Sequence, residues 1–286
     1  MGGLILSVIN MDSPKTIINE TDKTVQVAVG TILEDMRNEI LTKTNKSLYY
    51  PVDPTSRKDA LIGGTISCNA SGFIPGEKGA TRHWVNKLKI ILPNGYSQYI
   101  TRGEFISKNA EFHLECDNEK ILVQVPDYHR PKIKNASGPF TADDSEIDFI
   151  DLMIGSEGIF SLITEVEFNL ANSATEYLDL FIILTSEKEA VKLRGYLEDE
   201  NILYDLTALE YFGYNCQNYM EHKDKLFRDE ESVGIYLQYP AINESMDDVI
   251  IKWIKLLENS NCKIDDNDII LLNSPDNWRM FFEARH

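Results

Sequence analysis

The sequence predicts an α+β protein of two domains, with a boundary at about residue 172. Residues 1–172 contain most of the glycines and read as short strands separated by long loops. Residues 173–286 instead alternate in the order β-α-β-β-α-β, which is typical of a ferredoxin-like layer with two helices on one face of an antiparallel sheet. A chain of 286 residues is long enough for two domains, each with its own core.

Six segments of the first part have the composition of strands, and they cover residues 4–10, 24–29, 88–92, 97–101, 121–125 and 162–170. A helix is expected just after Gly30, with Thr31 as its N-cap. Glu34, three residues after Thr31, would complete a capping box. The segment Pro93-Asn-Gly-Tyr96 predicts a hairpin turn between two of the strands.

The second part shows clearer periodicity, and its expected strands cover residues 177–185, 202–211, 233–239 and 264–272. Ser186 is placed to cap a helix that runs to about Glu200. Residues 246–259 predict an amphipathic helix, with Val249, Trp253, Leu256 and Leu257 on its apolar side.

Charge and hydropathy exclude several classes of partner. Lys and Arg number 28 against 46 Asp and Glu, so the formal net charge is −18. This charge disfavours binding to nucleic acid and to anionic membrane surfaces. The longest strongly apolar run, residues 178–184, is far shorter than the ~20 residues of a membrane-spanning helix. No basic segment precedes the first apolar run, so no signal peptide is predicted.

Cysteine and histidine patterns predict no local metal site and no disulfide framework. The histidines form neither an H-x-H nor an H-x-x-x-H pair. The cysteines form no C-x-x-C pair and are spread along the chain, at Cys68, Cys116, Cys216 and Cys262. We therefore expect a reducing, cytoplasmic setting and no bound metal.

Two glycine-rich stretches are candidates for ligand binding. In residues 51–72, Gly63 and Gly64 are expected where side chains do not fit or where φ is positive, and small residues follow at 69–72. Backbone amides in such a segment can surround a flat or anionic ligand. An ordinary glycine-rich turn is the alternative, because neither G-x-G-x-x-G nor a Walker loop is present. In residues 151–165, Gly155 and Gly158 likewise indicate either close backbone approach to a ligand or a tight connection.

Taken together, the two stretches resemble the flavin-binding signatures of FAD-linked oxidases of the vanillyl-alcohol oxidase type, in the D-lactate, D-2-hydroxyglutarate and glycolate dehydrogenase branch. The resemblance covers about residues 1–170 in order and spacing. It is carried by Asp53-Pro-Thr-Ser56, Ile62-Gly-Gly64, Asn69-Ala-Ser-Gly72, Lys78-Gly-Ala-Thr-Arg82, Val85, Leu88, Ile91-Leu-Pro-Asn-Gly95, Lys134-Asn-Ala-Ser-Gly138, Gly155-Ser-Glu-Gly158 and Ile163-Thr-Glu165.

The resemblance implies an FAD-binding domain of the PCMH type over residues 1–172 and the family's substrate domain, incomplete, over residues 173–286. It implies FAD as the cofactor, with contacts from three groups of residues: Asp53, Pro54 and Ser56; Gly63, Gly64, Ser67, Cys68, Asn69, Ala70, Ser71 and Gly72; Glu157, Gly158 and Ile163. Arg285 resembles the family arginine that holds the substrate carboxylate, although a solvated terminal arginine is the alternative. For His83, near the expected flavin edge, a catalytic role is one interpretation, and a structural or solvated loop histidine is the simpler one.

The sequence also departs from the family pattern. It begins inside the strand that the family writes G-G-x-x-L-S, so the glycine-rich diphosphate loop that precedes this strand in the family has no counterpart here. The family's histidine-rich metal and acid/base segment would follow Arg285. Phe160-Ser161 replaces the family's Leu-Gly, and Cys68 stands where Ala or Thr is common. The resemblance therefore implies a flavoenzyme truncated at both ends.

Two functional hypotheses follow. In the first, the chain belongs to an FAD-dependent dehydrogenase that transfers a hydride from the α-carbon of a D-2-hydroxy acid to flavin N5, with electrons passing to an electron-transfer flavoprotein. In the second, it is a non-catalytic subunit or an inactive fragment that needs a companion chain to bind FAD. A stoichiometric flavin on the lone chain would favour the first hypothesis.

Overall fold

The computed structural model describes residues 7–116, 119–131, 133–142 and 146–283. It divides into two compact units, which are considered separately below. The first unit comprises residues 1–72 and 76–173, and the second comprises residues 73–75 and 174–286. Leu209 N donates to Phe73 O at 3.0 Å, which ties the short 73–75 segment to the rest of the second unit. The predicted α+β class is confirmed.

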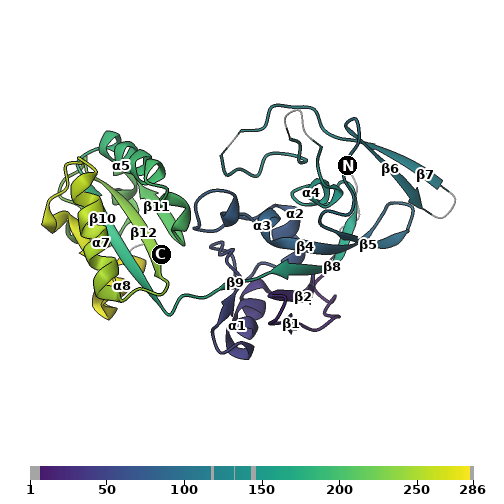
Figure 1. The fold of residues 1–286 in the computed structure, drawn as a ribbon, viewed down its shortest axis with the longest axis horizontal. Coiled ribbons are helices and arrows are strands. Elements are labelled where there is room, and N and C mark those ends of the chain that lie inside the picture. The colour runs from purple at the N-terminus through teal and green to yellow at the C-terminus, as the bar shows by residue number, and fades with distance from the viewer. Residues whose placement is uncertain (1–6, 117–118, 132, 143–145, 284–286) are drawn as a thin grey trace. The chain divides into compact units, whose positions relative to one another are not determined.

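A five-stranded antiparallel sheet forms the centre of the first unit (Figure 1). Its strands, in spatial order, are β1 (Ile17–Asn19), β2 (Thr24–Ala28), β8 (Leu162–Asn169), β4 (Val85–Ile91) and β5 (Ser97–Thr101). The expected turn joins β4 to β5: Gly95 has a φ of +87°, and Tyr96 N donates to the Asn94 side chain at 3.0 Å. β2 and β4 flank β8, so a late segment of the unit completes the sheet begun by early ones.

Shorter elements surround this sheet. The helices are α1 (Leu33–Lys43), α2 (Ile62–Ser67), α3 (Thr81–Trp84) and α4 (Phe149–Met153), with one 3-10 turn at Glu77–Gly79. Two further antiparallel pairs are β3 (Leu48–Tyr49) with β9 (Ala171–Asn172), and β6 (Glu111–Cys116) with β7 (Glu119–Gln124).

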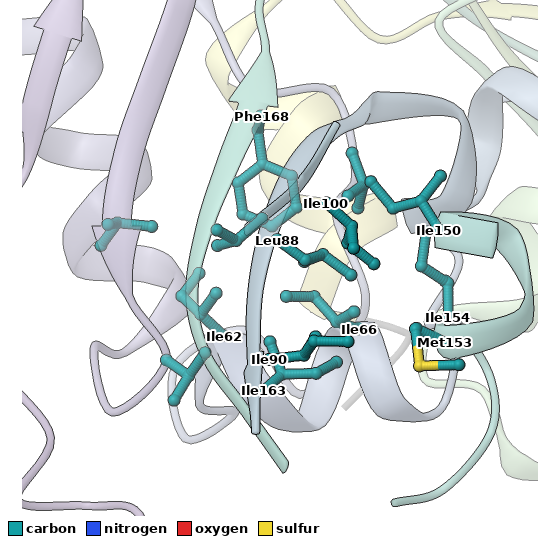
Figure 2. Close-up of a cluster of buried hydrophobic side chains, with 14 of the residues drawn as sticks. Ile62, Ile66, Leu88, Ile90, Ile100, Ile150, Met153, Ile154, Ile163 and Phe168 are labelled. Carbon is teal, nitrogen blue, oxygen red and sulfur yellow. The ribbon is translucent and has the colours of Figure 1, made fainter. Parts of the chain in front are cut away.

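The core of the first unit lies between the sheet and the helices α2 and α4 (Figure 2). Ile62 and Ile66 of α2 reach it from one side, and Ile150 and Met153 of α4 from another. All four are at most 1% exposed. The core therefore fixes the positions of both helices relative to the sheet, and with them the loops at their ends.

The predicted N-cap of α1 is wrong. The helix starts at Leu33 after Ile32, and no side chain caps it. Leu33 N donates instead to Ala60 O at 2.9 Å, and Glu34 N donates to Arg57 O at 3.1 Å. Carbonyls from a distant loop thus satisfy the amides that a Thr31 hydroxyl was expected to satisfy.

The second unit contains the predicted ferredoxin-like layer. Its antiparallel sheet has the order β11-β12-β10-β13. Helices α5 and α7 pack on the same face of this sheet, against alternate residues of β10 (Figure 1). The elements are β10 (Glu176–Leu184), α5 (Glu187–Asp199), β11 (Ala208–Phe212), β12 (Val233–Ala241), α7 (Met246–Asn259) and β13 (Ile269–Leu271).

An aromatic cluster covers the other face of that sheet. Phe181 of β10 lies 5.1 Å, centroid to centroid, from Phe281, and 5.7 Å from Phe227. Phe281 belongs to α8 (Pro275–Glu283), and Phe227 follows α6 (Lys223–Leu226). A 3-10 helix, Tyr214–Tyr219, lies between β11 and α6.

Three expected strands differ from the structure. Of residues 4–10, the first three lie outside the described residues, and residues 7–10 form no strand. The run 202–211 begins instead with a 3-10 turn at Leu203–Asp205, because α5 ends at a left-handed Asn201 (φ +59°) and Ile202 N donates back to Leu197 O. The run 264–272 likewise holds a 3-10 turn, Asp266–Asp268, before its short strand. None of the helices in the described ranges is both long and apolar enough to cross a bilayer.

Candidate functional site

Helix α2 has one buried face and one face without large side chains. Ile62 and Ile66 lie in the core, whereas Gly64 and the C-capping Cys68 are exposed and Ser67 is partly exposed. The spacing of Gly64, Ser67 and Cys68 puts them on one side of the helix. No atom lies within 4 Å of where a Gly64 Cβ would be. A flat ligand could therefore approach the helix backbone closely on this side.

Gly63 and Gly64 differ in what they allow. Neither has a positive φ, so the expectation that the backbone conformation requires glycine at these positions is wrong. A Cβ on Gly63 would lie 3.0 Å from the Val29 Cβ. This glycine therefore permits α2 to pack closely against Val29, the residue that follows β2. Gly64 faces open space and has no such packing role. The glycine pair thus combines one internal contact with one open position.

The loop that follows Asp53 lies beside the end of the glycine-rich segment. A Cβ on Gly72 would overlap the Asp53 backbone nitrogen, so only glycine permits this approach. The Asp53 carboxylate forms an ion pair with Arg57 and lies 3.6 Å from the Arg37 guanidinium. Pro54 O accepts from Arg57 N at 3.0 Å, and Ser56 O accepts from Ala60 N at 2.9 Å. These bonds hold the 53–60 loop in a defined turn.

The second glycine-rich stretch lies against the C-terminal end of α2. Gly155 N donates to Ile66 O, and Glu157 N donates to Ser67 O, both at 2.9 Å. Gly155, Glu157 and Gly158 all have positive φ, at +75°, +53° and +79°. No atom lies within 4 Å of a Cβ built on Gly158. The turn therefore adds a second exposed backbone segment directly beside the open side of α2.

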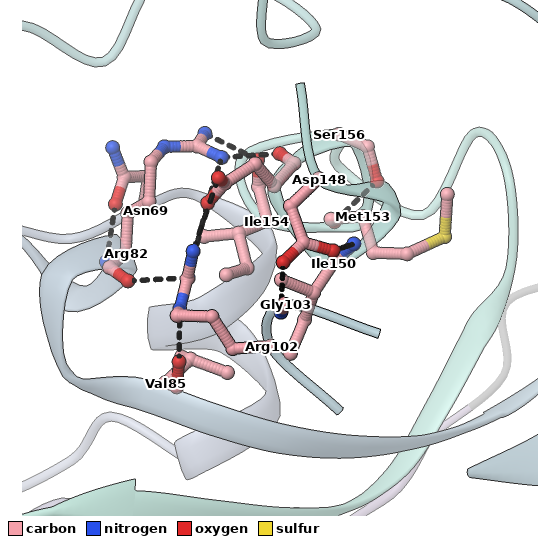
Figure 3. Close-up of polar contacts among 11 residues, drawn as sticks. Asn69, Arg82, Val85, Arg102, Gly103, Asp148, Ile150, Met153, Ile154 and Ser156 are labelled. Carbon is pink, nitrogen blue, oxygen red and sulfur yellow. Dashed lines mark hydrogen bonds and ion pairs between the residues drawn. The ribbon is translucent and has the colours of Figure 1, made fainter. Parts of the chain in front are cut away.

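Arg82, Arg102 and Asp151 hold these loops together, and Figure 3 shows the two arginines beside Asn69 and Ile154. Arg102 donates to both carboxylate oxygens of Asp151, at 3.0 and 3.1 Å, and to Arg82 O at 2.9 Å. Arg82 donates to the Asp151 backbone oxygen and, at 2.6 Å, to Ile154 O. Asn69, 2% exposed and with a φ of +48°, accepts from Arg82 N at 2.9 Å through its side-chain oxygen. Sequence reasoning missed Arg102 and Asp151 as a pair, because 49 residues separate them.

Burial is the largest influence on the Arg82 charge and lowers its pKa to about 10, so the guanidinium stays protonated at neutral pH. The Asp151 charge opposes this shift, whereas Arg130 and Arg102 add to it. His83, the next residue, is exposed. Partial burial, followed by the nearby Lys78 charge, lowers the pKa of its imidazole.

The structure brings most of the expected cofactor-binding residues together. Ala70 bonds through its backbone to Thr65 and Thr81, and the exposed Ser71 bridges to Ala80, so both lie in the same loop as Asn69 and Gly72. Ile163 is 7% exposed, and its side chain packs in the core near Ile90 and Ile66 (Figure 2), which gives it a packing role. Arg285 lies outside the described residues.

No group of three or more His, Cys, Asp or Glu side chains in the described ranges is arranged to hold a metal ion.

The comparisons agree with the geometry. Residues 1–99 match the FAD binding domain family. The chain is 30% identical over 171 residues to D-2-hydroxyglutarate dehydrogenase of Xanthomonas citri pv. viticola, covering 60% of this chain and 28% of that protein. It is 29% identical over 164 residues to glycolate oxidase subunit GlcD of Bacillus subtilis, covering 57% of this chain and 26% of that protein.

Another relative is D-lactate dehydrogenase of Anaerostipes hadrus, at 24% identity over 63% of this chain and 30% of that protein. The chain thus spans about a third or less of the length of these curated relatives. Among solved structures, alkyldihydroxyacetonephosphate synthase aligns with a TM-score of 0.63 at 11% identity, covering 96% of this chain and 46% of that one. These matches confirm the predicted resemblance, the fold class and FAD as the cofactor.

Proposed function

From the match of residues 1–99 to the FAD binding domain family, we propose that the chain functions in an FAD-dependent oxidoreductase acting on D-2-hydroxy acids of the lactate, glycolate or 2-hydroxyglutarate type. The observation that carries the proposal is the open side of α2 beside the positive-φ turn at Gly155–Gly158. The substrate class is supported by the relatives, which are dehydrogenases and an oxidase subunit for acids of this class.

The residues present fit a flat cofactor. Gly64 and Gly158 leave the space above their backbones free, and no side chain larger than cysteine stands on the open side of α2. In the proposal, Gly64, Ser67 and Cys68 line the flavin, while Glu157 and Gly158 approach the ribose side through their backbone. Asp53, Pro54 and Ser56 close the cofactor-binding surface at the neighbouring loop. Bound FAD would supply the hydride acceptor, its N5 atom, for the substrate α-carbon hydrogen.

In the proposal, the chain positions the cofactor and shields the flavin ring from solvent. Ile62 and Ile66 anchor α2 in the core, and the bonds to Gly155 and Glu157 fix the turn against it. Arg285 remains the candidate for holding the substrate carboxylate, because its planar fork suits bidentate binding. Residues 1–172 would then be the FAD-binding domain and residues 173–286 the substrate domain.

The wider setting belongs to the same proposal. We propose a reducing, cytoplasmic location, which is supported by the free thiols of Cys68, Cys216 and Cys262. An electron-transfer flavoprotein would accept the electrons, or a companion chain would complete the site.

The test is flavin binding by the purified chain. We expect added FAD to be retained after gel filtration with a visible spectrum perturbed from that of free FAD. Gly64→Leu should weaken FAD binding at least tenfold, because the new side chain occupies the space proposed for the ring. Gly195→Leu is the matched control, since Gly195 is also a helical glycine with no atom within 4 Å of its Cβ position.

Equal FAD affinity of the Gly64→Leu and wild-type chains would contradict the proposed surface. Absence of any FAD binding by the wild-type chain would favour the second hypothesis, a subunit that needs a companion chain. Reduction of the bound flavin by D-lactate, glycolate or D-2-hydroxyglutarate, followed at the flavin absorbance, then identifies the substrate within the class.

A further inference from the structure

A second feature of the first unit is a cavity of about 310 Å³ whose wall carries several charged side chains. It lies next to the C-terminal end of α2, since Asn69 forms part of its wall. Four cationic side chains line it, from Arg82, Arg102, Arg130 and Lys134, against the two carboxylates of Glu77 and Asp151. The cavity therefore has excess positive charge within a chain whose formal net charge is −18.

The Asp151 carboxylate offsets only part of this positive charge. Asp151 is shared by Arg102 and Arg82, and its two oxygens already accept from Arg102. Lys134 donates to Gly72 O at 2.9 Å. Within the described part of the chain, no carboxylate lies within ion-pair distance of Arg130, and the buried Nε atoms of Arg130 and Arg82 have no hydrogen-bond partner. The charge of the Arg130 guanidinium, which lines one wall of the cavity, is therefore not balanced by a paired carboxylate in the described residues.

Phe140 holds these two guanidinium groups in place. The Arg82 Cζ lies 4.2 Å from the centre of the Phe140 ring, and the Arg130 Cζ lies 4.3 Å from it. Contact with an aromatic ring restricts a guanidinium without consuming its hydrogen-bond donors. Two like charges are thus held near one ring, and an anion bound close to them would reduce their repulsion.

We propose that this cavity binds an oxyanion, a carboxylate or phosphate group, with the Arg130 guanidinium as its principal donor. A planar fork matches both groups bidentately. Such a group could come from two sources: the diphosphate of FAD, or the carboxylate of a separate small acid. The inference goes beyond the proposed function, because a simple anion can occupy the cavity whether or not the chain binds flavin.

The experiment is calorimetric titration of the full chain at low ionic strength with inorganic pyrophosphate and, separately, with oxalate. We expect saturable binding of at least one probe that weakens as salt is added. Arg130→Gln should reduce this affinity at least tenfold, and Arg130→Lys should reduce it less, because the charge remains while the fork is lost. Arg194→Gln is the matched control, since Arg194 pairs with Glu198 on the surface of α5.

Circular dichroism and the melting temperature of each variant establish that it is folded. Competition with FAD distinguishes the two sources, and either result supports the anion site. If the diphosphate of FAD occupies the cavity, FAD displaces pyrophosphate and Arg130→Gln also weakens FAD binding. If a separate acid does, oxalate still binds the FAD-loaded chain. The proposal is overturned if the wild-type chain binds neither probe, or if folded Arg130→Gln binds both with wild-type affinity.

Discussion

The two units differ in the sequence separation between helix ends or loops and the groups that bond to them. In the second unit, Ser186 and Ser245 cap α5 and α7 by accepting from amides three residues later. In the first unit, α1 is capped by carbonyls of residues 57 and 60, and Asp151 is held by Arg82 and Arg102. The caps of the two long helices of the second unit are thus local, whereas distant groups cap α1 and hold Asp151 in the first unit.

This difference has a functional consequence. The candidate cofactor surface and the cationic cavity both lie in the first unit, where loops are held by long-range contacts. Binding residues are commonly carried on loops that a rigid scaffold positions. Helix α2 shows the principle in six residues, because its apolar face is anchored in the core while its other face is left bare.

The largest expected effect tests the long-range network. Asp151→Asn keeps the shape of the side chain but removes the charge between Arg82 and Arg102, all three of which are at most 30% exposed. Breaking such a pair leaves buried charge uncompensated, and we expect a loss of about 3 kcal/mol in the free energy of unfolding, measured with urea. Glu198→Gln, in an exposed pair on α5, is the control and should change little. A loss as small as that of the control would show that the network does not hold the loops.

The second prediction compares glycines of the two units. A Cβ on Gly234 of β12 would overlap the ring of Phe181, which is fully buried in the aromatic cluster. We expect Gly234→Ala to cost about 2 kcal/mol by overpacking. Gly64→Ala meets open space in a helix and should stabilise the first unit by about 0.5 kcal/mol. Thermal unfolding of both variants checks the comparison, and a destabilising Gly64→Ala would contradict the view that this glycine serves a ligand.

The third prediction separates a real cap from an apparent one. Ser245 Oγ accepts from Asp248 N at 3.2 Å, so Ser245→Ala should cost about 1 kcal/mol. Thr31 has the sequence signature of a cap, but the N-cap position of α1 is Ile32, one residue later, and no side chain caps the helix. Thr31→Ala should therefore leave the unfolding free energy nearly unchanged. Equal losses in the two variants would restore the capping role that the sequence indicates for Thr31.

These contrasts explain which parts of the fold the sequence predicts. Periodicity and serine caps predict α7 from Met246 to Asn259, because every signal lies within the helix or one residue before it. The same reasoning fails at α2, where Ile62–Ser67 contains two glycines and reads as a loop. Its helical conformation depends on burying Ile62 and Ile66 against the sheet, which no local pattern records.

The candidate site divides in the same way. Resemblance to a family identifies the glycines and small residues of 53–72 and 155–158, because spacing in the sequence is enough to find them. Arg130 and Phe140 form one wall of the cavity together with Arg82, which lies 48 residues before Arg130. Only the folded chain brings their charges together, so neither composition nor motif spacing indicates an anion site in a chain of net charge −18.

The smallest predicted effect concerns a buried carboxyl group of the second unit, for comparison with Asp151. Asp179 has no cationic partner among the described residues. Its Oδ1 accepts from Tyr236 Oη at 2.6 Å and from Gln238 Nε2 at 2.9 Å. Burial raises the pKa of this carboxyl group, and the two neutral donors only partly oppose the shift. Because the folded-state pKa lies above the unfolded one, the contribution of Asp179 to stability is fully present below the unfolded pKa and is lost as the pH rises through the folded pKa.

Asp179→Asn keeps an acceptor oxygen for both donors but does not titrate. The variant should therefore gain stability relative to the wild type as the pH rises from about 4 to 7, measured by urea unfolding at several pH values. Asp151→Asn is the contrasting variant: its carboxylate lies between two guanidinium groups, and its loss should remain large at neutral pH. Parallel pH dependence of the unfolding free energy for the wild type and Asp179→Asn would mean that burial does not raise the pKa of this carboxyl group. The proposed contrast with Asp151 would then be wrong.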